Sequence, residues 1–84
     1  MTVKEAITLF KYYLQSNHRR RTIESYSYLL GRFEKIHAER SVDSLGSDEI
    51  FQFLESFTQG LAKSTRRLRY AQLKSFFNFI VHST

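Results

Sequence analysis

Apolar residues recur along the chain at the three- and four-residue spacing of amphipathic helices, and this pattern predicts four helices and no strand. The first helix is expected from about Val3 to Ser16. It follows a capping box in which the Thr2 hydroxyl accepts a hydrogen bond from the helix and Glu5 reaches back to Thr2. Its apolar stripe consists of Val3, Ala6, Ile7, Phe10 and Leu14.

The second helix is expected to start behind an N-cap at Thr22 and to run to about Ala38. Gly31 lies inside this helix, where it costs about 1 kcal/mol relative to alanine, so a close helix–helix contact is expected there. The apolar face is formed by Ile23, Tyr26, Leu30, Phe33 and His37, with Leu29 and Ile36 on its flank. A separate stripe carries Arg21, Ser25, Tyr28, Arg32 and Lys35.

The third helix is expected behind a cap at Ser47 and should end at Gly60 as a left-handed cap residue. The fourth should start behind Ser64 or Thr65 and continue to about His82. The buried stripes are Ile50, Phe53, Leu54 and Phe57 in the third helix, and Leu73, Phe76, Phe77 and Ile80 in the fourth. Before the third helix, Val42 and Leu45 should point into the core, and Asp48 and Glu49 should occupy the first turn of that helix. Four aromatic residues fall off the stripes and are candidates for contacts with another domain or subunit: Tyr12, Tyr28, Phe51 and Phe79.

Length and composition agree with one compact, all-α domain over residues 1–84, a four-helix bundle. The chain has no proline and three glycines, which favours long helices, and 15% aromatic residues supply a core for a small domain. It has no cysteine and no apolar run of the ~20 residues that span a bilayer. We therefore expect a soluble, cytoplasmic protein without a membrane partner.

The charge of +5 is distributed unevenly. Eight acidic residues balance eight basic ones up to Glu55, whereas the remaining segment has no acid and five cations: Lys63, Arg66, Arg67, Arg69 and Lys74. A one-sided basic segment suggests a polyanionic partner. A basic face that is merely solvated remains an alternative.

Two basic clusters stand at predicted helix starts, residues 18–22 and 63–69. Helix N-termini present free amides and a positive dipole end, which favour phosphate oxygens. No alternation of basic and aromatic residues indicates stacking on single strands, so duplex DNA is the expected partner. The candidate DNA-binding residues are Arg19, Arg20, Arg21, Thr22, Ser25, Lys63, Ser64, Thr65, Arg66, Arg67, Arg69 and Lys74, with Arg69 near the apolar side of its helix.

Nothing in the sequence supports catalysis. His18, His37 and His82 stand apart without metal-ligand spacing, and there is no Gly-rich phosphate loop. We expect no catalytic residue, no metal site and no cofactor in this chain.

Three blocks resemble the core-binding domains of tyrosine recombinases, the phage integrase family. Residues 22–33 match a T-x-x-x-Y-x-x-x-L-x-x-F pattern through Thr22, Tyr26, Leu30 and Phe33. Residues 45–54 are similar to a second block, although the acid stands directly before Ile50. Residues 64–80 resemble the closing helix, with Ser64-Thr65, Arg69 and the run from Leu73 to Ile80.

The resemblance implies a SAM-like four-helix bundle on one face of duplex DNA, forming half of a C-shaped clamp. The second and fourth helices would face the DNA, which points to Arg21, Thr22 and Ser25 at one place and to Lys63, Ser64, Thr65, Arg66 and Arg67 at the other. Cleavage would belong to a catalytic domain after residue 84, and other recombinase subunits would be partners. The remaining alternative is a helical protein-interaction module with a basic face for an acidic partner or a neighbouring subunit.

Overall fold

The computed structural model describes residues 1–83, with Ser83 described by its backbone alone, and consists of four α-helices with one short 3-10 turn. No strand occurs among these residues, so the predicted all-α, four-helix fold is confirmed. The bounds are α1 Val3–Asn17, α2 Arg20–His37, η1 Val42–Ser44, α3 Ser47–Phe57 and α4 Lys63–Ser83.

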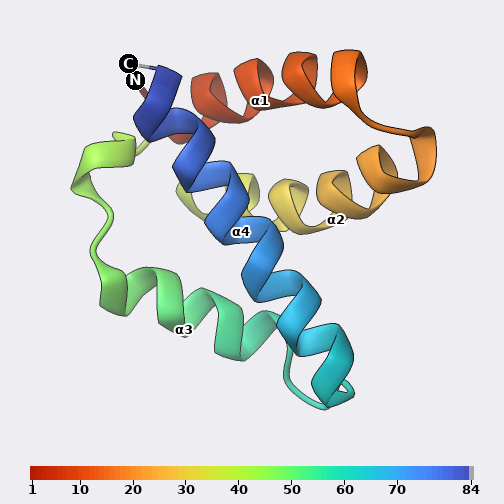
Figure 1. The fold of residues 1–84 in the computed structure, drawn as a ribbon. Coiled ribbons are helices and arrows are strands. Elements are labelled where there is room, and N and C mark those ends of the chain that lie inside the picture. The colour runs from red at the N-terminus through yellow and green to blue at the C-terminus, as the bar shows by residue number, and fades with distance from the viewer. Residues whose placement is uncertain (84) are drawn as a thin grey trace.

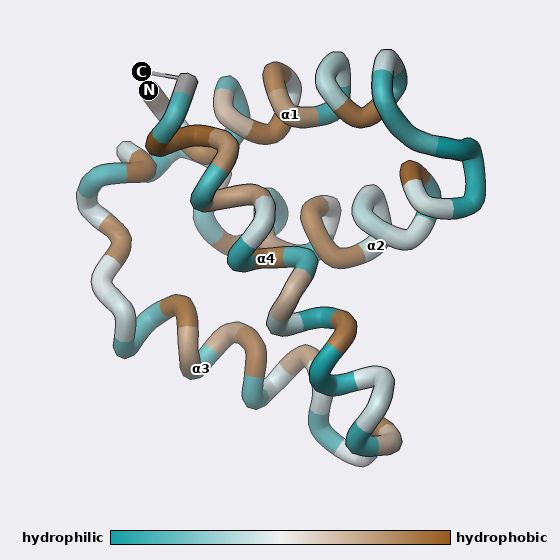
Figure 2. Tube along the Cα trace, in the orientation of Figure 1, coloured by the Kyte–Doolittle hydropathy of each residue, from teal (hydrophilic) through white to brown (hydrophobic). Residues whose placement is uncertain are grey.

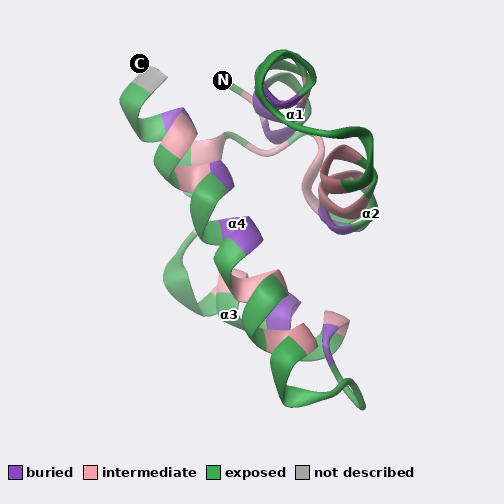
Figure 3. Ribbon diagram, turned by 45° about the vertical axis from the view of Figure 1, so that its right-hand side comes forward, coloured by how far each residue is buried: buried purple, intermediate pink, exposed green. Residues whose placement is uncertain are grey.

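The helices are arranged as an antiparallel hairpin crossed by the last helix (Figure 1). α1 and α2 form the hairpin, α4 runs diagonally across it, and α3 lies beside the first half of α4. Hydrophilic residues follow one another through the connection between α1 and α2 (Figure 2). The buried residues lie where the helices face one another (Figure 3).

Three fully buried phenylalanines join the helices into one core. Phe10 of α1 contacts Phe76 of α4 edge to face, with 5.4 Å between the ring centroids. Phe33 of α2 contacts Phe53 of α3 at 4.9 Å. Such edge-to-face pairs add roughly 0.5–1.5 kcal/mol to the burial of the rings. The predicted stripes are confirmed for the core residues Val3, Ala6, Ile7, Phe10, Leu14, Leu29, Leu30, Phe33, Phe53, Leu54, Leu73, Phe76 and Ile80.

The segment before α3 is held against the start of α1. The predicted capping box forms, with the Thr2 backbone amide donating to the Glu5 carboxylate at 2.8 Å and the Glu5 backbone amide donating to the Thr2 hydroxyl at 3.2 Å. Thr2 forms an isolated antiparallel bridge with Ser41, and Arg40 forms an ion pair with Glu49 in the first turn of α3. Val42 and Leu45 pack against the core, as predicted.

The N-cap of the second helix lies three residues earlier than predicted. Arg19 is its N-cap in an extended conformation, and Ile23 donates the first helical hydrogen bond to the Arg19 carbonyl at 3.0 Å. Just before this cap, the His18 ring packs edge-on against Tyr13, with 5.8 Å between the ring centroids. The prediction of Thr22 as the cap was wrong, and Arg20, Arg21 and Thr22 form the first turn itself.

The caps of the last two helices also differ from the predictions. Gly46 is the N-cap of α3, so Ser47 is its first helical residue. α3 ends at Phe57 rather than Gly60, and its C-cap Thr58 is buried, with its hydroxyl donating to the Leu54 carbonyl at 2.7 Å. Gly60 does have a left-handed φ of 80°, but it lies in the following turn. α4 begins at Lys63, and its first backbone bond runs from Arg66 to Ala62, so Ser64 and Thr65 stand inside the helix rather than at its cap.

Three expectations about packing were wrong. Gly31 is exposed and a Cβ there would meet nothing within 4 Å, so it marks no close helix contact. Ile36 is 63% exposed because it faces away from the core. Phe79 packs on the core, with its ring 5.3 Å from that of Phe10, since α4 passes directly over α1.

Candidate nucleic-acid interface

The start of α2 presents cations around a helix end that has no side-chain cap. Arg19, Arg20 and Arg21 are all exposed, and no acidic residue occurs in the first turn. Arg20 pairs with Glu24 at 3.2 Å, but the two side chains are 94% and 68% exposed, so this pair contributes little and is easily broken. Arg19 and Arg21 form no ion pair among the described residues. The half-buried Thr22 adds a hydroxyl to the same turn.

The start of α4 has the same character. Lys63 and Arg67 are exposed, Ser64 is exposed between them, and the first turn contains no acid. Arg66 points instead toward α3, where it donates to Glu55 at 2.7 Å. Thr65 is half-buried, and Lys74 is exposed further along the helix.

The other two long helices begin differently. Glu5 lies in the first turn of α1, and Asp48 and Glu49 lie in the first turn of α3. Hydrogen bonds from Thr2 lower the pKa of Glu5, and hydrogen bonds from Arg40 lower that of Glu49. Acids in a first turn satisfy the helix dipole from within the protein, whereas cations there are mildly unfavourable for the isolated helix. The first turns of α2 and α4 therefore lack the internal acid that the first turns of α1 and α3 contain.

Hydrogen bonds connect α2 and α4 at the point where the two helices cross. Arg69 donates through Nη1 to the Ser25 carbonyl at 2.9 Å, to the Ser25 hydroxyl at 3.3 Å and to the side-chain oxygen of Gln72 at 3.0 Å. Gln72 is buried and donates to the Ser25 hydroxyl at 2.9 Å. Ser25 and Arg69 are thus engaged with each other inside the domain.

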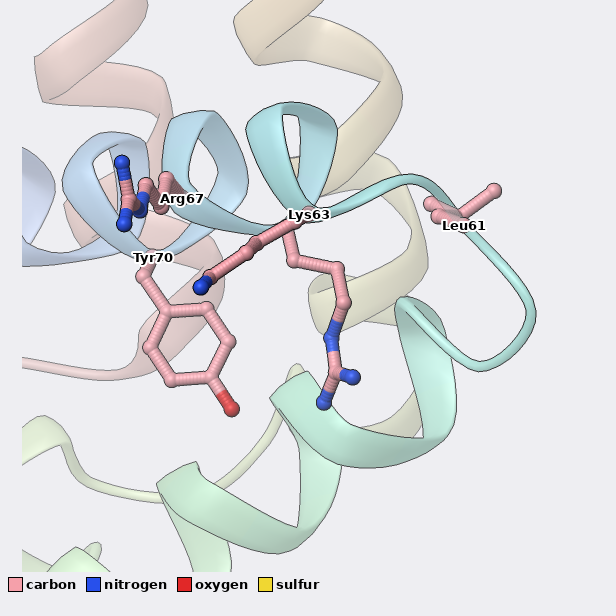
Figure 4. A pocket seen from close by; sticks show the side chains of 5 residues that line it. Leu61, Lys63, Arg67 and Tyr70 are labelled. Carbon is pink, nitrogen blue, oxygen red and sulfur yellow. The ribbon is translucent and has the colours of Figure 1, made fainter.

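A surface hollow of about 540 Å³ lies between the two helices at this crossing. Arg19, Arg21, Thr22, Ser25 and Tyr26 line it from α2, and Leu68, Ala71 and Gln72 line it from α4. A second open hollow, of about 640 Å³, lies at the start of α4 and is lined by Leu61, Lys63, Arg66, Arg67 and Tyr70. Figure 4 shows the side chains of Lys63 and Tyr70 directed to the same side of α4. The two hollows share no lining residue, because Leu68, Ala71 and Gln72 line the first whereas Lys63, Arg66, Arg67 and Tyr70 line the second.

One residue of this contact, Gln72, was not singled out from the sequence, and the contacts of Tyr28 within the domain were not predicted. Gln72 accepts a hydrogen bond from Arg69 and donates one to Ser25, but it has no charge and belongs to no motif that would mark it in the sequence. Tyr28 was placed off the apolar stripe, and its ring lies 5.5 Å from that of Phe57 and 5.4 Å from the Arg69 guanidinium carbon. Only the common helical stripe of Arg21, Ser25 and Tyr28 could have suggested their shared surface.

No other kind of site competes with this surface among the described residues. They contain no group of three or more His, Asp or Glu side chains that could hold a metal ion. His18 and His82 are exposed and His37 is half-buried. In the part of the chain described, no helix is both long enough and apolar enough to cross a membrane.

Over residues 1–83, the fold is a small all-α domain of four helices, and two of these helices begin with exposed cations. Comparison with known families identifies it: residues 7–84 match the N-terminal SAM-like domain of phage integrases, and the chain belongs to this family. No curated protein and no solved structure matches the chain significantly. The family supports a role in a tyrosine recombinase or integrase, in which the N-terminal domain is not the catalytic part.

Proposed function

We propose that this domain binds duplex DNA through the starts of α2 and α4, as the core-binding half of a clamp in a tyrosine-type recombinase. The observation that carries the proposal is that α2 and α4, the two helices that cross at Ser25 and Arg69, both begin with exposed cations and have no acid in their first turn. Membership of the integrase family supplies the context. The catalytic domain of the same recombinase and its neighbouring subunits on DNA are the further partners we propose.

Four cations at the two helix starts are available to contact phosphates. Arg19, Arg21, Lys63 and Arg67 are exposed and form no ion pair within the described residues. Exposed amides at the two helix starts and the hydroxyls of Thr22, Ser64 and Thr65 would add uncharged donors. Lys74 would extend the contact along α4.

The remaining cations of the candidate set would contribute differently. Arg20 and Arg66 must first leave Glu24 and Glu55, which weakens their contribution to affinity. Arg69 and Ser25 are occupied by their mutual hydrogen bonds. Phosphate contacts of this kind position a protein on DNA without reading sequence, so most of the affinity should be electrostatic.

An NMR titration of the 84-residue chain with a short duplex DNA tests the proposal. Amide shifts should change at residues 19–25 and 63–67 and should fade as salt is added. Charge reversal by Arg21→Glu or Arg67→Glu should weaken binding, whereas Lys4→Glu, the same change at the exposed start of α1, should weaken it much less. Shift changes confined to α3, or a DNA affinity that both reversals leave untouched, would overturn the proposal and favour a protein partner for the basic face.

A further inference from the structure

Arg69 extends from α4 and contacts both α2 and α3. From α4 its guanidinium reaches Ser25 of α2 through hydrogen bonds, and its central carbon lies 5.4 Å from the ring centroid of Tyr28, also of α2. The same carbon lies 5.6 Å from the ring centroid of Phe57 of α3. The planar guanidinium can stack on rings and donate in its plane together, which the ammonium of a lysine cannot do.

The charge of Arg69 is not compensated inside the domain. Among the described residues no carboxylate pairs with it, and its Nε atom is buried without a hydrogen-bond partner. A half-buried cation without an acid costs stability, and an apolar residue of similar size is often the more stable choice at such a position. Stability alone therefore does not account for an arginine at this junction.

The contact between Ser25 and Arg69 lies close to both basic clusters along their helices. α2 starts five residues before Ser25 and α4 starts six residues before Arg69, so each helix start lies roughly 7–9 Å along its axis from the contact. A change in the Ser25–Arg69 contact would shift one cluster relative to the other. We infer that Arg69 is a positioning residue, which fixes the spacing of the α2 and α4 clusters so that both contact one DNA backbone together.

This inference rests on the proposed function, and a comparison of variants separates the two. The affinity of the 84-residue chain for a short labelled duplex is measured by fluorescence anisotropy for wild type, Arg21→Gln, Arg69→Lys and the double variant. Arg69→Lys keeps the charge and loses the fork of donors and the stacking. Lys4→Gln in each background is the matched control, and thermal unfolding confirms that each variant is folded.

If Arg69 positions the two clusters, the effects of Arg21→Gln and Arg69→Lys on DNA affinity are not additive. Arg21→Gln should weaken binding by about fivefold or more in wild type and by about twofold or less in the Arg69→Lys background, because residues that depend on one another couple energetically. Lys4→Gln should have the same small effect in both. Should Arg69→Lys fail to fold, Arg69→Met, of similar length and apolar, is used in the same comparison.

Two results would overturn the inference while the proposed function stands. One is an equal loss from Arg21→Gln in the wild-type and Arg69-variant backgrounds. The other is wild-type affinity for both Arg69 variants. If instead Arg21→Gln and Lys63→Gln have no effect on the affinity of the wild-type chain, the proposed function fails, and the inference fails with it.

Discussion

Arg69 of α4 donates a 2.9 Å hydrogen bond to the backbone carbonyl of Ser25 of α2, across 44 residues of sequence. Both residues were candidates for DNA contact from their charge, hydroxyl and position. Because Ser25 and Arg69 contact each other, they lie at the crossing of α2 and α4, whereas the exposed cations lie at the starts of these two helices. The DNA contacts that we propose are thereby concentrated on Arg19, Arg21, Lys63 and Arg67.

Removing the acid that holds Arg66 should strengthen DNA binding. Glu55→Gln releases Arg66 and removes a negative charge beside the α4 cluster, so affinity for duplex DNA at low salt should rise about threefold. The Glu55 and Arg66 side chains are 44% and 42% exposed, and the loss of their pair should cost at most about 1 kcal/mol of stability. Anisotropy titrations measure the change. Glu39→Gln, at an exposed acid after α2, is the control, and an equal gain from both variants would show that only net charge matters.

Two glycines should respond oppositely to alanine. Gly31→Ala adds a methyl group in open space inside a helix and should raise the free energy of unfolding by up to about 1 kcal/mol. Gly60→Ala places a side chain at a φ of 80° and should lower it by about 1–2 kcal/mol. Urea denaturation followed by circular dichroism measures both. A destabilised Gly31→Ala would mean that this helix face packs against something.

Acid should destabilise the domain partly through Glu5 and Glu49. Their pKa values are lowered in the folded state from an ordinary value of about 4.5, so their contribution is fully present above that pH and is lost as the pH falls through the folded-state values. The urea midpoint of wild type should therefore fall as the pH drops below about 4.5. Glu49→Gln should be less stable near neutral pH and should lose less on acidification. A Glu49→Gln curve parallel to that of wild type would contradict this.

The sequence predicted the helices and the buried stripes because both follow from local periodicity. It misplaced the starts of α2 and α3, since their N-caps, Arg19 and Gly46, form no side-chain capping hydrogen bond and so carry no capping pattern that the sequence could show. The same limit applies to the site. Charge and hydroxyl patterns could suggest Arg21 and Lys63, but the partners of Arg69 and the burial of Gln72 depend on how α2 crosses α4.

The salt dependence of DNA affinity tests the central claim most directly. Four phosphate contacts, each contributing about 0.9, predict a slope near −3.6 for log affinity against log salt concentration in the 84-residue chain. Arg21→Gln and Lys63→Gln should each make the slope shallower by about 0.9, and Lys4→Gln should leave it unchanged. A slope near zero, or one that neither Arg21→Gln nor Lys63→Gln alters, would contradict a DNA interface at the starts of α2 and α4.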